Sequence, residues 1–392
     1  MPELSKRITG LVNQGGDGWG VHYRAQNLRA SGIDVTMLSV GDHDIKTAPA
    51  VLEVMTQSAI GGNLGYTSVQ GDRKLREAIA SRVTRNRRIG ATAQNIVVTP
   101  GGQGAIFSTM MAVLDAGNSC IVMDPFYASF DITVRAAGGE AILVPTPAEH
   151  GFQLDPKAIE AAIRPDTRAI LINTPNNPTG AVYERSRLEA VAEICKRHDL
   201  WLISDELYDS QVFDGDHISP RDLPDMVERT IVIGSMSKGF AMTGARIGWA
   251  VGPVHLIEKI VDLAGATTYG LPGFIQDAST YALTDNAEQE AEVAARYQRR
   301  REIAVRVMAG SNQIRMSPPS GGMYVMLDVR ATGLSGIGFA EQLLDAEHIA
   351  VMPGESFGRA AAGHVRVAMT VSDSQLEDAL QRLLRFGEQL IG

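Results

Sequence analysis

Cysteine is scarce in this sequence, and long apolar runs are missing from it. Only two cysteines, Cys120 and Cys195, occur among 392 residues. Cys120 lies in the apolar run 120–123 and Cys195 on the inner face of a predicted helix, so we expect reduced core thiols. Residues 1–7 lack the apolar core of a signal peptide, and no stretch approaches the roughly 20 apolar residues of a membrane span. We therefore predict a cytoplasmic protein with no membrane partner.

An excess of positive charge is also missing. The chain has 36 Lys and Arg against 45 Asp and Glu, a formal net charge of −9. A nucleic acid or an anionic membrane as partner would require a basic face, which this balance disfavours. Internal repeats and low-complexity segments that would indicate a solenoid or a disordered chain are absent too. We predict no nucleic-acid partner and no metal site.

The middle of the sequence alternates short apolar runs with amphipathic helices. One predicted helix, residues 184–200, carries Leu188, Val191 and Cys195 at helical spacing between two such runs, which makes a β-α-β unit. Near-continuous apolar runs are typical of parallel strands buried on both faces. We therefore predict an α/β core, with ligands beyond the carboxyl ends of the strands. The predicted strands are residues 96–99, 120–124, 141–145, 169–173, 201–205 and 231–234.

The stretch 234–248 follows the last of these strands and carries the strongest chemical signal. Lys238 lies between Ser235 and Ser237 on one side and Arg246 on the other. Lysine supplies a nucleophilic amine, and hydroxyl and guanidinium groups suit a phosphate dianion. The combination indicates pyridoxal 5'-phosphate (PLP), bound to Lys238 as a Schiff base. A surface lysine in a polar loop is the simpler alternative for this stretch alone.

Two earlier strand ends carry weaker signals. Gly102 and Gln103 belong to the glycine-rich segment 100–106 that opens a helix, where backbone N–H groups and the helix dipole favour a phosphate. Such turns are common without any ligand. Tyr127 follows the strand 120–124 and suits stacking on a flat heterocycle, although core packing explains an aromatic residue equally well.

The next two strand ends add an amide, a carboxylate and a phenol. Asn177 lies in the proline-rich turn 174–180, where its amide can donate to a phenolate oxygen, although a plain turn explains the segment too. Asp205 ends an apolar strand, where a carboxylate is costly unless paired, and a protonated pyridine nitrogen is a suitable partner. Tyr208 follows three residues later. A helix-start aspartate is the alternative for Asp205.

These residues resemble a known family. The motifs Asn173-x-Pro-x-Asn-Pro-Thr-Gly180, Ser204-Asp-Glu-Leu-Tyr208 and Ser235-x-Ser-Lys-x-x-x-x-x-Gly-x-Arg-x-Gly248 are similar, in this order, to those of the class I/II aminotransferases of PLP fold type I. The similarity extends from Gly41 to Arg366. It implies a large domain, residues 48–284, with a mostly parallel seven-stranded sheet, and a smaller α+β domain made of residues 1–47 and 285–392.

The resemblance also implies a role for each matching residue. Lys238 is the residue that binds the cofactor and moves protons, Asp205 pairs with the pyridine nitrogen, and Tyr208 completes the catalytic set. Gly41, Asn177 and Arg366 contact the substrate, and Arg366 clamps its α-carboxylate. A surface arginine on an edge strand is the alternative for Arg366. The implied cofactor-binding residues are Gly102, Gln103, Tyr127, Asn177, Asp205, Tyr208, Ser235, Lys238, Arg246 and, from the neighbouring subunit of a homodimer, Tyr66.

The implied function is a ping-pong transfer of an amino group from an L-amino acid to a 2-oxo acid. Within the family the chain most resembles bacterial arginine–pyruvate transaminases, judging by Trp19-x-x-His-Tyr-Arg24 and Phe213-Asp-Gly-Asp-His217 among other segments. Asp42 and Asp44 can attract a guanidinium, but solvated loop carboxylates are the simpler expectation.

Two other enzyme functions stay open. One is an aspartate or aromatic aminotransferase that uses 2-oxoglutarate, and the other is a PLP-dependent β-eliminating C–S lyase. A transcription regulator with a vestigial aminotransferase domain is disfavoured, because residues 1–41 are too short and too little basic to bind DNA.

In the part implied to be the smaller domain, we expect helices at 285–308 and 339–347 and a strand at 321–327. Residues 372–375 form a predicted capping box that opens the last helix.

Overall fold

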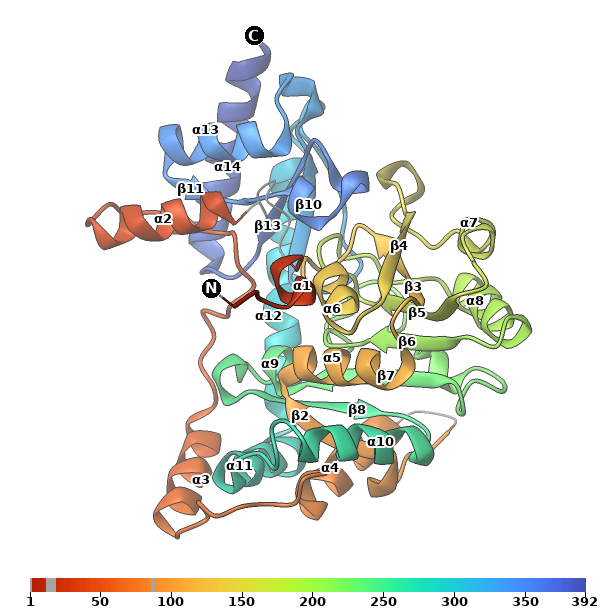
Figure 1. Cartoon of the computed structure of the whole chain (residues 1–392). Coiled ribbons are helices and arrows are strands. Elements are labelled where there is room, and N and C mark those ends of the chain that lie inside the picture. The colour runs from red at the N-terminus through yellow and green to blue at the C-terminus, as the bar shows by residue number, and fades with distance from the viewer. Residues whose placement is uncertain (1, 12–18, 86–88) are drawn as a thin grey trace.

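A seven-stranded sheet forms the centre of the protein (Figure 1). The computed structural model describes residues 2–11, 19–85 and 89–392. The strand order is β2-β8-β7-β6-β5-β3-β4, and every pair is parallel except those that β8 makes with β2 and β7. The mostly parallel sheet of seven strands is confirmed. Its strands are β2 (Ile96–Pro100), β3 (Ser119–Asp124), β4 (Glu140–Pro145), β5 (Thr167–Asn173), β6 (Trp201–Asp205), β7 (Thr230–Ser235) and β8 (Ile247–Val251).

Two details of this sheet differ from the sequence-based expectation. The strand β8 was not predicted, because its apolar run Ile247–Val251 directly follows Arg246 and was interpreted as part of the phosphate-binding motif. The expectation that every strand is buried on both faces is wrong for β4. This strand lies at the edge of the sheet with β3 as its only neighbour, and Leu143 is exposed.

Successive side chains of a strand point to opposite faces of the sheet. Both faces are apolar here, and helices cover each of them. Cys120 and Val122 of β3 belong to the apolar cluster under α5, α6 and α10, whereas Ile121 and Met123 pack with α7 and α8. The α-helices are α1 (Lys6–Thr9), α2 (Gly20–Ala30), α3 (Pro49–Ile60), α4 (Arg73–Thr84), α5 (Gly101–Val113), α6 (Phe130–Ala136), α7 (Pro156–Ala161), α8 (Arg185–Arg197), α9 (Met236–Gly239), α10 (Val254–Gly265), α11 (Gly273–Thr284), α12 (Glu288–Met308), α13 (Gly336–Glu347) and α14 (Asp373–Ile391).

A second, smaller layer of structure lies at the top of Figure 1. An antiparallel sheet of order β12-β13-β10-β9 packs with α2, α13, α14 and part of α12 around its own apolar cluster. The strands are β9 (Arg315–Ser317), β10 (Tyr324–Asp328), β12 (Met352–Pro353) and β13 (His364–Ala368). The capping box is confirmed, because Ser372 and Gln375 cap each other's backbone at the start of α14. The division of the chain at residues 47/48 and 284/285 stays a prediction, which this separate core supports.

The N-terminal part of the chain joins the small layer before it crosses to the large one. Strand β1 (Thr36–Met37) pairs in parallel with β11 (Ile349–Ala350). From there the chain runs down the left side of Figure 1 to α3. The segment 39–47 on this path, called the strap below, lies between the two layers. In the part of the chain that the structure describes, no helix is long and apolar enough to cross a membrane.

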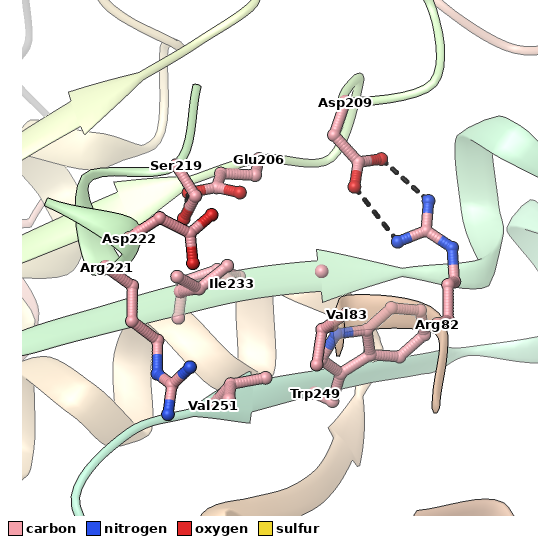
Figure 2. Close-up of a pocket in the computed structure, with 12 residues that line it drawn as sticks. Arg82, Val83, Glu206, Asp209, Ser219, Arg221, Asp222, Ile233, Trp249 and Val251 are labelled. Atoms are coloured by element: carbon pink, nitrogen blue, oxygen red, sulfur yellow. Dashed lines mark hydrogen bonds and ion pairs between the residues drawn. The ribbon is translucent and has the colours of Figure 1, made fainter. Parts of the chain in front are cut away.

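An ion-pair cluster joins α4 and α12 to the loop after β6, and Figure 2 shows its Arg82–Asp209 pair. Arg82 donates from its two terminal nitrogens to Asp209, over 2.9 and 2.8 Å, and also contacts Glu290. The side chains of Arg82, Asp209 and Trp249 line a pocket of about 360 Å³, the open solvent at its mouth included. Gly234 accommodates this indole, because a Cβ atom there would lie 2.3 Å from its Nε1. We interpret the cluster as structural, since it ties three separate segments together.

We expect Arg82→Leu to destabilise the protein by roughly 3 kcal/mol, because it removes the guanidinium from two partly buried carboxylates. The matched control is Arg73→Leu on the same helix, whose exposed pair with Glu77 contributes little. Urea denaturation of both variants measures the difference. Equal stability of the two variants would contradict the structural role.

Candidate active site

A cavity of about 1270 Å³, its open mouth included, lies at the carboxyl ends of the parallel strands. Its walls come from the turns after β2, β3, β5, β6 and β7, from the strap, and from β10 and β13 of the small layer. The structure therefore brings together segments that are far apart in the sequence. The lining residues that the sequence predicted are Gly41, Gly102, Gln103, Tyr127, Asn177, Asp205, Tyr208, Lys238, Arg246 and Arg366.

Lys238 reaches this cavity from α9, a single turn directly after β7. Ser235 caps this turn, because its hydroxyl oxygen accepts from the Ser237 backbone N–H over 3.0 Å. The Lys238 Nζ donates to the Gly41 carbonyl oxygen over 2.5 Å. Lys238 is the one lysine among the described residues of the wall, and its amine is held against the strap, so the surface-lysine alternative is wrong.

Asp205 ends β6 with its side chain buried at the bottom of the cavity. One carboxylate oxygen accepts from the Leu207 backbone N–H over 3.2 Å. Burial raises the pKa of Asp205 to about 7, since this single contact does not replace the lost water. The helix-start alternative is wrong, because residues 207–210 form a turn rather than a helix. A cationic or N–H-bearing ligand would offset the burial of this carboxyl group.

Arg366 lies in the middle of the small sheet, so the edge-strand alternative is wrong. Strand β13 pairs on one side with β10 and on the other with β12, and Arg366 is 4% exposed. Its guanidinium is sandwiched between the rings of Tyr324 and Phe357, 4.3 and 4.4 Å from their centroids. It donates to Ser39 O over 2.6 Å and to Asn177 Oδ1 over 2.9 Å, while its Nε has no hydrogen-bond partner.

The buried guanidinium of Arg366 also lacks a carboxylate. Desolvation lowers the pKa of Arg366, because burial disfavours the charged guanidinium. Among the described residues, no carboxylate pairs with this group. A bound carboxylate is the group that would supply the missing charge and occupy the free donor.

Several tyrosine side chains line the same cavity as Asp205. The Tyr208 hydroxyl lies 3.3 Å from that of Tyr324, and burial raises the pKa of Tyr208 well above its usual value. Tyr324 was missed by the sequence reasoning. It packs against Gly41, where a Cβ atom would come within 1.8 Å of the Tyr324 hydroxyl oxygen, a contact visible only in the structure. Tyr127 lines the wall from the turn after β3, and its pKa is raised by burial.

Close backbone packing at the start of α5 forms the expected anion cradle. Gly101 adopts a φ of +73°, and a Cβ there would lie 2.4 Å from an Arg246 guanidinium nitrogen. Gly248 packs against the same turn, with 2.3 Å between its ideal Cβ position and Gly101 C. Arg246 itself donates to Thr243 O over 2.8 Å. Free backbone N–H groups and a guanidinium therefore lie side by side, as a phosphate requires.

Two predicted cofactor residues do not line the cavity. Ser235 lies directly behind the wall: its hydroxyl is 2.9 Å from the Oγ of Ser237, which lines the cavity, and 3.0 Å from Ile247 O. Tyr66 lies on the surface, 96% exposed, beside Tyr269. For Ser235 to bind the phosphate, its hydroxyl would have to rotate toward the cavity. For Tyr66 to reach the phosphate, a second subunit is needed.

Asp42 and Asp44, the two acidic residues of the strap, have different partners. Asp44 is exposed, as expected of a loop carboxylate, but it is also paired, because Arg300 donates to its two oxygens over 2.8 and 2.6 Å. Asp42 lines the cavity and accepts from Thr243 Oγ1 over 2.9 Å.

Comparison with known proteins identifies the family. Residues 33–383 match the family described as aminotransferase class I and II. The chain belongs to this family. It is 39% identical to an arginine–pyruvate transaminase of Pseudomonas aeruginosa, over 100% of this chain and 98% of that protein. It is 37% identical to an aspartate/prephenate aminotransferase of Thermus thermophilus, over 93% and 94% of the two chains. A solved structure of Thermus thermophilus aspartate aminotransferase with maleate superimposes with a TM-score of 0.92, at 35% identity, over 98% of this chain and 100% of that one.

The chain is therefore a PLP-dependent aminotransferase of fold type I. The donor set of the cavity fits this cofactor. Asp205 offers a buried carboxyl group to a ring nitrogen, the α5 start and Arg246 offer donors to a phosphate, and Lys238 offers an amine to a carbonyl. The unpartnered Nε of Arg366 fits the carboxylate of an amino acid.

We expect the cofactor-free Asp205→Asn variant to be more stable than the cofactor-free wild type at pH 8, by roughly 2–4 kcal/mol. In the unfolded chain Asp205 titrates near 3.8, whereas in the folded chain the pKa is about 7. Between these values the folded state keeps a proton that the unfolded state has released, so wild-type stability falls as pH rises from 4 to 7. Denaturation curves at pH 4, 6 and 8 test this, and a pH-independent difference between the two proteins would contradict it.

Proposed function

We propose that this enzyme transfers the amino group of an L-amino acid to a 2-oxo acid by a ping-pong mechanism. The observation that carries the proposal is the meeting of the Lys238 amine, the Asp205 carboxyl group and the Arg366 guanidinium in one cavity. PLP offers a carbonyl group to the Lys238 amine and a ring nitrogen to the Asp205 carboxyl group. An amino acid offers its carboxylate to the Arg366 guanidinium. Two half-reactions in the same cavity follow, since one carboxylate clamp serves both the donor and the acceptor.

The catalytic roles follow from these positions. PLP, when bound, supplies the electron sink that makes the Cα proton of an amino acid removable. Lys238 would anchor the cofactor and, once released, would move the Cα proton of the substrate to the cofactor carbon that the lysine had held. Asp205 keeps the ring nitrogen protonated. Arg366 orients the substrate through its α-carboxylate, with Asn177 and Gly41 beside it.

The remaining contacts hold the cofactor. We assign the ring to Tyr127, the phenolic oxygen to Asn177 and Tyr208, and the phosphate to Gly102, Gln103, Ser235 and Arg246. Gln103 is held by Thr133 and Ser129, over 2.6 and 2.8 Å, which keeps its side chain in the wall.

We propose that the active form is a homodimer in which Tyr66 reaches the phosphate in the partner subunit. The exposed tyrosine lies near other exposed apolar residues of the same region, Ile60 and Leu64, and a monomer gains nothing from exposing them. Localisation in the cytoplasm stays a prediction from the sequence.

We expect Lys238→Ala to abolish the visible absorbance that the wild type shows with PLP and to lower turnover by about four orders of magnitude or more. Lys259→Ala is the control, because Lys259 lies on the surface and pairs with Asp262. Absorbance spectra of the purified proteins decide the point. A Lys238→Ala variant that keeps the wild-type band would refute the assignment of the anchoring lysine.

For the donor and acceptor, we propose L-arginine and pyruvate. The 39% identical Pseudomonas aeruginosa protein carries this name. Among the described residues, the charged ones of the cavity wall are Asp42, Asp205, Lys238, Arg246 and Arg366. The cofactor and the α-carboxylate account for all of these except Asp42. Asp42 then offers its charge to a cationic side chain, whereas no cation is left for a second carboxylate.

Aspartate or prephenate chemistry with 2-oxoglutarate is the second candidate, favoured by the 37% identical Thermus thermophilus protein. A β-eliminating lyase on cysteine-type substrates is the third, since it would use the same cofactor residues. The absence of a free cation for a distal carboxylate in the described wall favours arginine over aspartate.

We expect kcat/KM to be about threefold to tenfold higher for L-arginine than for L-citrulline, its neutral analogue, with pyruvate as acceptor. The ratio falls toward one in Asp42→Asn, because only the cationic donor uses the carboxylate. Initial rates with arginine, citrulline, aspartate and phenylalanine measure it. Preference for aspartate with 2-oxoglutarate, or release of ammonia and pyruvate from cysteine, would replace this donor assignment by one of the alternatives.

A further inference from the structure

The strap, residues 39–47, connects the groups of the active site to each other. Successive strap residues contact different functional elements. The Ser39 carbonyl accepts from Arg366 and the Val40 carbonyl from Thr370, over 2.6 and 3.1 Å. The Gly41 carbonyl then accepts from Lys238. One short segment thus touches both the carboxylate clamp and the catalytic amine.

His43 makes the next contact, and its tautomer is determined by its partners. Its Nε2 lies 3.1 Å from the Ser237 carbonyl oxygen, which can only accept, so Nε2 carries the hydrogen. Its Nδ1 then has a free lone pair, and the Tyr297 hydroxyl donates to it over 2.9 Å. Burial, followed by the charge of Lys238, lowers the pKa of His43 to about 4. His43 is therefore neutral and in one tautomer near neutral pH.

These contacts enclose Lys238 at two points. The Ser237 carbonyl that accepts from His43 belongs to the same peptide group as the Lys238 backbone nitrogen. The Gly41 carbonyl that accepts from Lys238 Nζ lies two residues before His43. One end of the lysine, its backbone, and the other end, its amine, are thus both held by the strap. Loss of the His43 contact removes the strap's hold on the backbone end and leaves the Lys238 carbonyl with its 3.4 Å contact to Gln211 Nε2.

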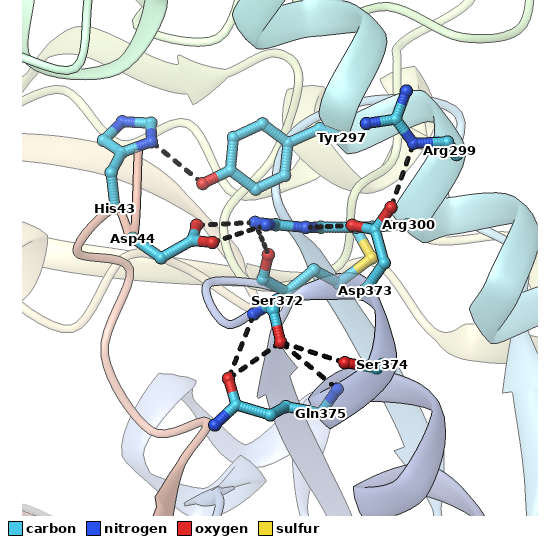
Figure 3. Close-up of polar contacts among 10 residues, drawn as sticks. His43, Asp44, Tyr297, Arg299, Arg300, Ser372, Asp373, Ser374 and Gln375 are labelled. Carbon is cyan, nitrogen blue, oxygen red and sulfur yellow. Dashed lines mark hydrogen bonds and ion pairs between the residues drawn. The ribbon is translucent and has the colours of Figure 1, made fainter. Parts of the chain in front are cut away.

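The far side of His43 is anchored to the small layer (Figure 3). Tyr297 lies on α12, and the next strap residue, Asp44, pairs with Arg300 one helical turn further along. Arg300 is 3% exposed in its side chain and also donates to Asp373 at the start of α14 and to Met369 O. The anchor of His43 is therefore rigid, since α12 and α14 are tied together at this point.

We propose that His43 is a positioning residue for the reaction, which orients the Lys238 amine by holding the Ser237–Lys238 peptide against α12. This inference rests on the proposed function for its catalytic consequence. The hydrogen-bond geometry on which it depends exists in the cofactor-free chain. The positioning role can therefore be tested without any reaction.

The decisive variant is His43→Phe, which keeps a ring against Tyr297 but removes both hydrogen bonds. His43→Gln retains an N–H donor toward Ser237. The matched control is Thr47→Val, which removes a hydrogen bond of 2.8 Å from the same strap to Ala241 O in the same loop, without touching the Lys238 peptide. Comparison of the three variants distinguishes the loss of the Ser237 hydrogen bond from a general loosening of the strap.

In His43→Phe we expect kcat to fall about 10- to 100-fold while KM for the donor changes less than about threefold, since the amine is misplaced and the carboxylate clamp is intact. The visible circular dichroism per bound PLP changes as well. His43→Gln recovers most of kcat, and Thr47→Val stays within about twofold of the wild type. Equal kcat in His43→Phe and Thr47→Val, or a loss carried by KM, would overturn the proposal.

A second measurement is independent of the proposed function. In the cofactor-free proteins, amide hydrogen exchange of residues 236–242 is expected to accelerate at least about tenfold in His43→Phe and to stay unchanged in Thr47→Val. Unchanged exchange in His43→Phe would overturn the positioning role. If exchange accelerates while none of the proteins, the wild type included, gains visible absorbance with PLP, the proposed function fails and the role of His43 in holding this turn stands.

Discussion

Two ionisable groups, Asp205 and Arg366, are buried in the active-site cavity with too few partners. The Asp205 carboxyl group has one backbone donor, and the Arg366 guanidinium has two neutral acceptors and a free Nε. Burying such groups costs several kcal/mol unless a ligand completes their contacts. A protonated ring nitrogen and an α-carboxylate are complementary to them. The proposed roles of Asp205 and Arg366 therefore assign cofactor binding to one end of the cavity and substrate binding to the other.

The large sheet supplies the geometry that this arrangement needs. Parallel strands end at the same edge, so turns from five strands converge on one cavity. The antiparallel strand β8 brings Gly248 against Gly101 and places Arg246 beside the start of α5. These contacts are so close that side chains larger than glycine do not fit. The anion cradle thus depends on backbone packing as much as on charge.

The small layer contributes the substrate end of the cavity, and the strap joins it to the large layer. Arg366 comes from β13, whereas Lys238 follows β7, and both are hydrogen-bonded to carbonyl groups of the strap. A shift of one layer against the other would therefore be transmitted to both groups. The pair between Asp44 and Arg300 holds the strap on α12, the long helix that runs between the two layers in Figure 1.

The amino-acid sequence by itself determined six strands of the large sheet, the turns that follow them and several of the polar residues in the cavity. These features are local: an apolar run of strand length, a glycine turn and a polar side chain just past a strand can all be recognised without knowing their neighbours. Lys238, Asp205 and Asn177 were found in this way.

Only the tertiary structure decided what lies around them. Strand β8 was missed because its direction depends on pairing with β2 and β7, and β4 is exposed because no strand follows it in the sheet. Tyr324 and Phe357 enclose Arg366 from distant segments, Ser237 rather than Ser235 lines the wall, and Asp44 has a buried partner. Burial and partnership are properties of contacts between residues far apart in the chain, and periodicity along the sequence does not encode them.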